Sequence, residues 1–297
     1  MTPIRLFVNP KAGRGGALNS LPQVERTLRA VGVDIDTRFS RSAGDLEYQL
    51  RAGVREGCET LVVAGGDGSF HAAVNGLLDA GGSRIGLLPL GTGNDFAKSA
   101  GIPGDAATAA RQLGERLRNG TTLGRFDAGR CNERYFHNGA GVGIDARVAQ
   151  IAAGVRLPIG DLVYAWGIAR CLIDGIATPS MQIRVDDTTI WDGPATLANI
   201  ANGPWVGSQF LIAPDADPSD GHFDVVIADA VTRRRVMSLL PKLLKGRHVH
   251  EPEVSVNRGQ SIRLSCEQPL IAHLDGELQA AATGFELQCL PGALHLL

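Results

Sequence analysis

A repeated strand–helix order over residues 1–125 is the feature that most constrains the fold. Short apolar runs indicate strands, and each is followed by apolar residues at helical spacing, such as Leu21, Val24 and Leu28 after the first run. The strand-like runs lie at residues 4–8, 33–39, 60–64 and 85–88. Such alternation is typical of a mostly parallel sheet with helices on both faces. We therefore expect a three-layer α/β domain at residues 1–125.

Residues 126–297 follow a different pattern, in which short β-like runs, such as 188–191 and 196–200, are separated by turn residues. This pattern favours an antiparallel β-sandwich. Two helical segments, 162–174 and 232–244, interrupt it, and Pro241 is expected to bend the second. The sequence thus predicts an α/β domain followed by a β domain, with the last strand able to return to the first domain.

Composition narrows the classes of partner and compartment. The 297 residues carry a formal net charge of −2, so the chain offers no broad attraction for nucleic acid. Five widely spaced cysteines without a CxxC pair, and a strand-like N-terminus, favour a cytoplasmic protein with free thiols and no zinc. No apolar stretch reaches the roughly 18 residues of a membrane span. The oligomeric state stays open, a homodimer included.

Three glycine-rich segments follow strands of the first domain. The first comprises Asn9, Pro10, Lys11, Ala12 and Gly13; the second comprises Gly65, Gly66, Asp67, Gly68 and Ser69; the third includes Thr92, Asn94 and Asp95. The carboxyl ends of parallel strands meet at one edge of a sheet, where ligands bind. Bare backbone N–H groups suit phosphate, and nearby carboxylates suit Mg²⁺. We expect a nucleotide-phosphate site there, with Ser69 capping the next helix; ordinary tight turns are the alternative.

Two acidic segments mark the second domain. Asp275 and Glu277 flank a glycine after a short β run, and a carboxylate within hydrogen-bond reach of a hydroxyl can accept its proton. The alternative is an exposed hairpin turn. The loop at residues 213–224 carries aspartates whose spacing could hold a hard cation through oxygen ligands. A solvated turn explains that loop equally simply.

In their order along the chain, these motifs resemble those of the diacylglycerol kinase catalytic family, which includes soluble bacterial lipid kinases, sphingosine kinases and ceramide kinases. The matching segments are Asn-Pro-Lys-Ala-Gly, Gly-Gly-Asp-Gly-Ser, Gly-Thr-Gly-Asn-Asp-Phe-Ala and Asp-Gly-Glu. The resemblance implies an ATP-dependent lipid kinase with the two-domain fold that this family shares with NAD kinases. It also implies Mg²⁺ as a cofactor, a lipid acceptor and transient peripheral contact with a membrane. It does not specify the lipid.

The resemblance assigns roles to residues of the first domain. Nucleotide contacts fall on the first two glycine-rich segments and on three further polar residues, Ser40, Thr92 and Asn94. Three acidic residues match a group that organises catalytic Mg²⁺ and water, namely Asp67, Asp95 and Asp127. Two departures stand in the second segment. Ser69 replaces the family's usual Thr and keeps its hydroxyl, whereas His71 and Ala72 replace a frequent Asn-Glu pair, so a carboxylate is lost.

In the second domain, the resemblance favours Asp275 as the catalytic base, with Glu277 second or supporting. The loop at 213–224 resembles the family's structural Mg²⁺ loop, with Asp217, Asp220 and the carbonyl of His222 as ligands. The segment 232–247 is basic and amphipathic, and it could rest on an anionic bilayer or pack on its own domain. Residues 140–177 are small and apolar, which suits either a lipid pocket or a core.

Two other functions stay open. A soluble-substrate kinase of the NAD kinase type shares the Gly-Gly-Asp-Gly segment, but the third glycine-rich segment argues against it. A nucleotide-binding sensor without turnover would need no base, so the retained Asp67, Asp95 and Asp275 argue against it.

Overall fold

The computed structural model describes residues 3–155 and 162–297 and divides the chain into two compact units. Unit 1 joins Met1–Asp127 to Pro291–Leu297, and unit 2 is Ala128–Leu290. No helix in the described parts of the chain is long and apolar enough to span a bilayer. All five cysteines are free thiols.

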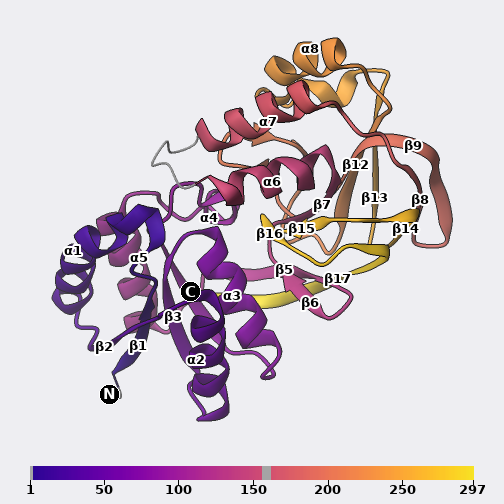
Figure 1. Ribbon diagram of the computed structural model, residues 1–297. Coiled ribbons are helices and arrows are strands. Elements are labelled where there is room, and N and C mark those ends of the chain that lie inside the picture. The colour runs from indigo at the N-terminus through magenta and orange to yellow at the C-terminus, as the bar shows by residue number, and fades with distance from the viewer. Residues whose placement is uncertain (1–2, 156–161) are drawn as a thin grey trace. The chain divides into compact units, whose positions relative to one another are not determined.

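Unit 1 is built on a parallel sheet (Figure 1). In spatial order its strands are β2 (Ile35–Phe39), β1 (Ile4–Val8), β3 (Thr60–Gly65), β4 (Arg84–Pro89) and the end of β17 (Ala282–Leu296). Strands β3 and β4 are almost wholly buried and β1 is buried over its last three residues, which explains why they appear in the sequence as continuous apolar runs.

Two pairs of helices form the outer layers of unit 1. The helices are α1 (Gly16–Ala30), α2 (Ala43–Arg55), α3 (Asp67–Leu78) and α5 (Ala106–Asn119), with the short η1 (Ala12–Gly15) and α4 (Asp95–Ser99) in loops. α1 packs on α5, and α2 packs on α3. Gly76 permits the second contact, because a Cβ there would lie 2.4 Å from the carbonyl oxygen of Glu47. The three-layer α/β prediction is confirmed.

Unit 2 is an antiparallel β-sandwich. The main run of neighbouring strands is β16 (Glu277–Leu278), β15 (Ala272–Leu274), β7 (Gly139–Gly143), β9 (Thr188–Ala201), β8 (Ser180–Val185), β14 (Ser261–Leu270) and β17. Strand β12 (Phe223–Asp229) pairs with β9 and with β13 (Val254–Gly259), while β5 (Gly124–Cys131) pairs with β6 (Arg134–Phe136) and β17. A fully buried core holds the sandwich, with Phe136 and Phe223 stacked at 5.4 Å between ring centroids.

The long strand β9 corrects the prediction of two separate strands. Residues 188–194 pair with β8, and the rest pairs with β7 and β12, so one strand contributes to both parts of the sandwich. Gly193 at φ 150 and Pro194 interrupt the apolar pattern where this change occurs, which is why the sequence suggests a break.

Helices of unit 2 lie beside its strands (Figure 1). Two were predicted and are found as α7 (Leu162–Asp174) and α8 (Arg233–Leu243), the latter containing Pro241. A third, α6 (Ile144–Gly154), was not foreseen; it follows β7 directly and packs on α7. The short η2 (Arg247–His250) follows α8. Part of the predicted lipid-pocket segment, residues 156–161, lies outside the described residues.

Candidate active site

The first glycine-rich segment is tied to the second through Asn9. This residue follows β1, and its side-chain amide donates to the Ser69 hydroxyl over 2.8 Å. Its side-chain oxygen Oδ1 accepts from the backbone N–H of Lys11 over 3.0 Å, which folds the loop back on itself. Asn9 thus holds the first glycine-rich segment against the second at the carboxyl edge of the sheet.

Direct backbone contact joins the other segments. A Cβ on Gly66 would lie 2.9 Å from the Cα of Gly91, and one on Gly91 would lie 2.3 Å from the Cα of Gly66. Gly13 has φ 54, and a Cβ there would lie 2.6 Å from the carbonyl oxygen of Leu90. Only glycine fits these positions, because they combine close approach with, at Gly13, a left-handed backbone. The three loops that follow β1, β3 and β4 therefore come together in unit 1.

Ser69 does not cap α3, so that prediction is wrong. The helix begins at Asp67 after Gly66, whose carbonyl oxygen accepts from the backbone N–H groups of Ser69 and Phe70 over 2.9 and 3.0 Å. The helix begins three residues earlier than a Ser69 cap requires, which leaves the Ser69 hydroxyl free to accept from the Asn9 amide. The cap position thus has no side chain, which leaves bare backbone beside the loop.

Asn94 shapes its own loop. It has φ 52, donates to the carbonyl oxygen of Gly91 over 2.9 Å and accepts from the N–H of Gly91 over 3.1 Å. Thr92, in the same loop, is exposed. Ser40 is buried at the end of β2, where its hydroxyl donates to the carbonyl oxygen of Val8 over 3.3 Å. The nucleotide contacts assigned to these three residues stay predictions.

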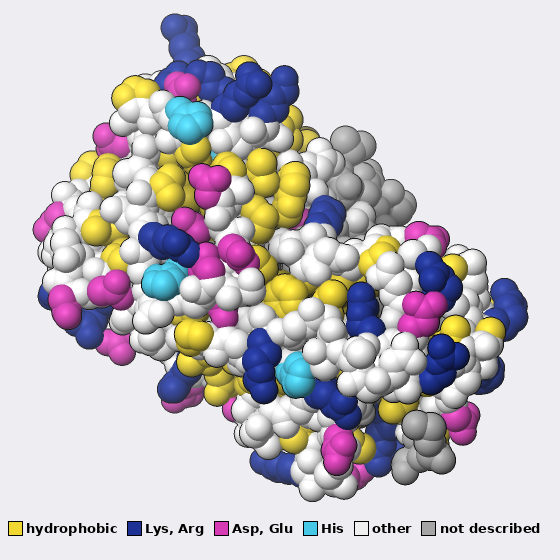
Figure 2. Space-filling model, turned by 180° about the vertical axis from the view of Figure 1, so that it is seen from behind, with side chains coloured by type: hydrophobic (Ala, Val, Ile, Leu, Met, Phe, Trp, Pro, Cys, Tyr) yellow, Lys and Arg dark blue, Asp and Glu magenta, His cyan; other side chains and the backbone are white. Residues whose placement is uncertain are grey.

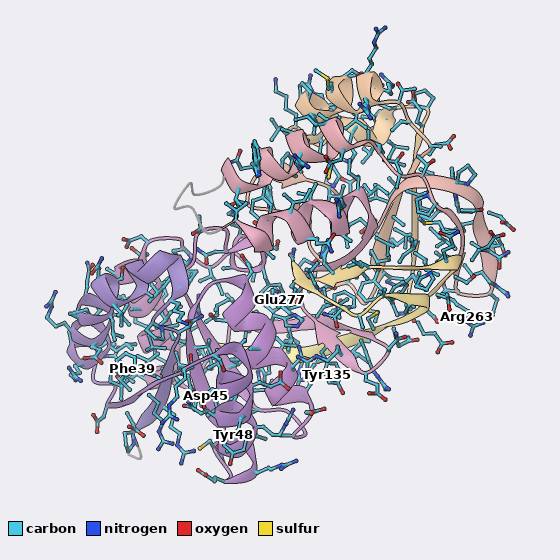
Figure 3. All side chains as sticks on the ribbon, viewed as in Figure 1. Phe39, Asp45, Tyr48, Tyr135, Arg263 and Glu277 are labelled. Atoms are coloured by element: carbon cyan, nitrogen blue, oxygen red, sulfur yellow. The ribbon has the colours of Figure 1, made fainter. Side chains whose placement is uncertain are left out.

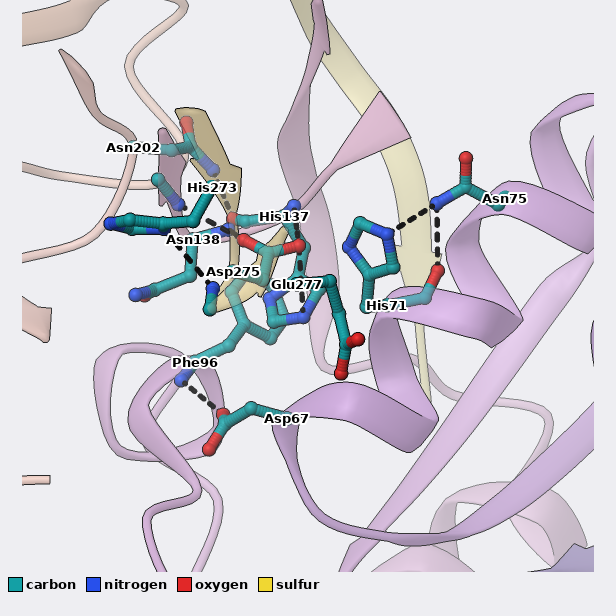
Figure 4. Close-up of polar contacts among 12 residues, drawn as sticks. Asp67, His71, Asn75, Phe96, His137, Asn138, Asn202, His273, Asp275 and Glu277 are labelled. Atoms are coloured by element: carbon teal, nitrogen blue, oxygen red, sulfur yellow. Dashed lines mark hydrogen bonds and ion pairs between the residues drawn. The ribbon is translucent and has the colours of Figure 1, made fainter. Parts of the chain in front are cut away.

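The three predicted magnesium carboxylates of unit 1 have different surroundings. Asp67 is half-buried at the start of α3 and accepts from the N–H of Phe96 over 3.4 Å (Figure 4). Asp95 pairs with Lys98 over 3.2 Å. Asp127 is 1% exposed and accepts from the N–H of Gly292 over 2.7 Å, where the chain returns to this unit.

Across residues 3–155 and 162–297, no three His, Cys, Asp or Glu side chains gather as a ready metal cluster. Mg²⁺ commonly binds one or two protein carboxylates and completes its shell with phosphate and water. Asp67 fits that role, since it is half-buried at the start of α3 and lies between Gly66 and Gly68 in the chain. Asp127 is almost fully buried and accepts from the backbone N–H of Gly292, and its metal role stays a prediction.

His71, one of the two residues that replace the family's frequent Asn-Glu pair, packs inside unit 1. His71 and Asn75 are both buried on α3, at 4% and 2% exposure. The Asn75 amide donates to the His71 carbonyl oxygen over 2.9 Å and lies 3.4 Å from Nε2 of the ring (Figure 4).

In unit 2, the carboxylate of Asp275 is enclosed by backbone donors. Oδ1 accepts from Asn138 over 2.8 Å and from Gly139 over 3.1 Å, and Oδ2 accepts from His137 over 3.1 Å. The side chain is 0% exposed, and Nε2 of His137 lies 3.4 Å from Oδ2 (Figure 4). A carboxylate offers about four lone-pair sites. Asp275 therefore fastens the turn between β15 and β16 to the start of β7.

Glu277 differs from Asp275 in the exposure of its side chain. It is the first residue of β16 and is exposed (Figure 3). The two acids of the Asp-Gly-Glu segment are thus separated into a buried one that is held by backbone and an accessible one.

A second, largely buried network includes His273, which lies next to the same turn in the chain. Nε2 of His273 lies 3.0 Å from Oδ2 of Asp145 on α6, and the Asn199 amide donates to that oxygen over 2.7 Å. Burial would raise the pKa of Asp145, but the charge and hydrogen bonds of His273 and Asn199 lower it overall. Burial would lower the pKa of His273, yet Asp145, with a smaller effect of Asp275, raises it overall.

The predicted structural metal loop, residues 213–224, is contacted by a cation of the protein, Arg258 on β13. Asp220 accepts from the N–H of His222 over 2.9 Å and pairs with the guanidinium of Arg258. Asp217 accepts from the backbone and hydroxyl of Ser219 over 2.9 and 2.6 Å. Burial raises the pKa of Asp224 despite Arg258. A metal role for Asp217, Asp220 and His222 stays a prediction.

Sequence reasoning missed the partners of the Asp275 turn. These are the backbone of residues 137–139 and the side chains of Asp145, Asn199 and His273. The one available signal was the glycine-rich run Gly139–Gly143, which resembles the other ligand loops in composition.

Comparison with known proteins agrees with these features. Residues 3–126 match the diacylglycerol kinase catalytic domain, and residues 139–297 match the YegS C-terminal NAD kinase beta sandwich-like domain. A diacylglycerol kinase of Mycobacterium tuberculosis is 30% identical over 298 residues, which cover 99% of this chain and 94% of the relative.

Two solved structures share the fold. A crystal structure of a diacylglycerol kinase from Bacillus anthracis is 20% identical, with a TM-score of 0.75 over 99% of this chain and 95% of the other. An NAD kinase from Archaeoglobus fulgidus is 12% identical, with a TM-score of 0.53 over 98% of this chain and 92% of the other. The two matched domains and the full-length relative show that this chain belongs to the diacylglycerol kinase family and is a lipid kinase.

Proposed function

We propose that this enzyme transfers the γ-phosphate of ATP to a hydroxyl group of diacylglycerol or a related membrane lipid. The observation that carries the proposal is the junction of three glycine loops at the carboxyl ends of β1, β3 and β4, with Gly66 and Gly91 in backbone contact. Such a surface suits a polyphosphate. The Archaeoglobus fulgidus relative in fold was solved in complex with ATP, which supports this nucleotide.

Phosphoryl transfer asks the protein mainly for positioning and charge neutralisation. In the proposed reaction, the lipid oxygen bonds to the γ-phosphorus while the bond from that phosphorus to the β–γ bridging oxygen breaks. The hydroxyl proton passes to Glu277, the exposed acid of the turn, rather than to Asp275 as the sequence suggested. Mg²⁺, when bound with the nucleotide, would neutralise phosphate charge, and Asp67 would hold it.

The test measures ATP consumption with three acceptors: diacylglycerol in mixed micelles, NAD, and none. We expect ATP consumption with diacylglycerol, and none with NAD or without an acceptor. Turnover with NAD would favour the soluble-substrate alternative, and ATP binding without turnover on any lipid would favour a sensor. Asp67→Ala should abolish lipid phosphorylation in a folded protein, whereas the exposed control Glu267→Gln should leave it unchanged.

A membrane lipid has to be reached at the bilayer surface, and α8 carries a face suited to that. We define the basic α8 face as Arg233, Arg234, Met237, Leu244, Lys245 and Arg247. Met237 and Leu244 are 60% and 46% exposed. No Asp or Glu occurs from residue 231 to residue 250. Figure 2 shows Lys and Arg side chains gathered over this helix.

The charges of this face are available to a partner. Arg235 and Lys242 of the same helix are paired with Glu251 and Glu253. The four other cations form no salt bridge with any residue that the structure describes. Like charges would oppose each other in a two-fold dimer through this face, whereas an anionic bilayer complements it. We therefore assign peripheral membrane contact to the basic α8 face.

Vesicle sedimentation without ATP tests this assignment. Each basic side chain near an anionic surface contributes about 1 kcal/mol. Reversing Arg233 and Arg234 to Glu should thus weaken binding to phosphatidylglycerol vesicles by at least about 30-fold, with little binding to phosphatidylcholine in either protein. The matched control is Arg263→Glu on β14. Equal binding of the reversed and control variants would contradict the assignment.

A further inference from the structure

The two ring nitrogens of His273 face different groups. The residue lies on β15, and its side chain is 3% exposed. Nδ1 accepts the backbone N–H of Gly276 over 3.2 Å, and Nε2 lies 3.0 Å from Oδ2 of Asp145. The ring therefore connects the start of α6 to the turn that carries Glu277.

These neighbours select one protonation state of the ring. An N–H group pointing at Nδ1 requires a lone pair there, and a carboxylate beside Nε2 favours a proton there. The Asn199 amide holds the same carboxylate oxygen. A neutral ring with its proton on Nε2 accepts from Gly276 at Nδ1 and turns the proton toward the carboxylate 3.0 Å away, whereas an imidazolium would place a second proton against Gly276.

Strand β7 leaves space for this pair. A Cβ on Gly141 would lie 2.2 Å from Oδ2 of Asp145 and 2.4 Å from Nε2 of His273. The carboxylate and the ring thus pack directly on a strand position that lacks a side chain. The positions of Asp145 and His273 are therefore fixed by their packing on Gly141 as well as by their hydrogen bonds with Asn199 and Gly276.

The turn above this pair is left-handed at two successive residues. Asp275 has φ 54 and Gly276 has φ 87. A non-glycine residue in this region persists only where its surroundings hold it. The Asp275 carboxylate holds one side of the turn through residues 137–139, and Nδ1 of His273 holds the peptide that directly precedes Glu277.

We propose that His273, as the neutral tautomer protonated on Nε2, is a positioning residue that aims Glu277 through its acceptor contact with Gly276. The inference rests on the proposed function, since it takes Glu277 to be the base. His273 touches neither ATP nor lipid in this account. Asp145, with Asn199, orients the ring and selects its tautomer.

Two substitutions separate the two ends of the ring. In His273→Asn, the amide oxygen stands close to the position of Nδ1 and can still accept from Gly276, while contact with Asp145 is lost. In His273→Gln, the longer side chain reaches Asp145 but offers Gly276 no acceptor. A misplacement of about 1 Å can cost about 100-fold in rate. We expect His273→Gln to lower kcat by about 10- to 100-fold with KM for ATP unchanged, and His273→Asn to stay within a few-fold of the parent.

A purely structural role would lower stability and activity together, so the unfolding free energy of both variants is measured beside kcat. Equal losses of kcat in the two variants would overturn the inference. Nitrogen-15 NMR of the unmodified protein tests the tautomer without any assay of activity. A protonated Nδ1 at the pH of full activity would overturn the inference even if neither variant folded.

Glu277→Gln distinguishes a failed inference from a failed function. If this variant is active, the base assignment is wrong, and the positioning role falls with it while ATP-dependent transfer stands. If it is inactive and His273→Gln is fully active, the base assignment stands and only the positioning role is wrong.

Discussion

Replacing Asp275 and Glu277 separately should divide stability from chemistry. In Asp275→Asn, the remaining oxygen can still accept from Asn138 and Gly139, but an NH₂ group replaces the acceptor that faces His137. Loss of that acceptor costs about 1–3 kcal/mol, and each of the other bonds weakens by about 1 kcal/mol when its acceptor loses its charge. The expected loss of unfolding free energy is therefore about 3–5 kcal/mol, a large part of the roughly 5–15 kcal/mol that a domain has.

Glu277→Gln should show the opposite behaviour. The side chain is exposed, so its replacement should change the unfolding free energy by less than about 0.5 kcal/mol. Loss of a general base should lower kcat by about 10²- to 10⁴-fold. Urea unfolding and lipid phosphorylation are measured on both variants beside Glu267→Gln. An Asp275→Asn protein of unchanged stability and abolished turnover would return the base role to Asp275 and refute this reasoning.

Further predictions concern the buried pair and the nucleotide loops. The pKa of His273 is raised by Asp145 and that of Asp145 is lowered, so the pair stabilises unit 2 from about pH 4 upward and loses this contribution as pH increases through the raised pKa of His273. Urea unfolding across this range should show the difference between the parent and Asp145→Asn shrinking at alkaline pH; a constant difference would exclude the ion pair. The rate of phosphoryl transfer should instead increase with pH, because a protonated Nδ1 of His273 would face the N–H of Gly276 and lose that contact. A rate that rises toward acid pH would contradict this expectation. Gly66→Ala should weaken ATP binding by at least about 10-fold, as measured by calorimetry, because the added Cβ clashes with Gly91. An unchanged affinity would show that these loops do not bind the nucleotide.

Local patterns in the sequence were sufficient for the fold and for the loops of unit 1. Helical and strand periods differ sharply in residues 1–125, and glycine loops after parallel strands necessarily meet at one edge, as Gly66 and Gly91 do. The cap at Ser69 was misplaced because the competing acceptor is the backbone carbonyl of Gly66, which has no side-chain signature.

The roles within the Asp-Gly-Glu segment could not be predicted from the sequence. The donors that occupy Asp275 are backbone N–H groups 136 to 138 residues earlier in the chain, and backbone donors leave no residue-type signal. The pairing of His273 with Asp145 likewise depends on β15 lying beside β7, which only the sheet topology reveals. Two adjacent acids therefore looked equivalent until burial and partners separated them.

Transfer of radiolabelled phosphate from ATP into the organic phase of a lipid panel tests the central claim most directly. We expect γ-label, but not α-label, in one or more hydroxyl-bearing lipids, and no label in the lipid extract when Asp67→Ala replaces the parent. Label released only as inorganic phosphate, or found only in NAD, would contradict it.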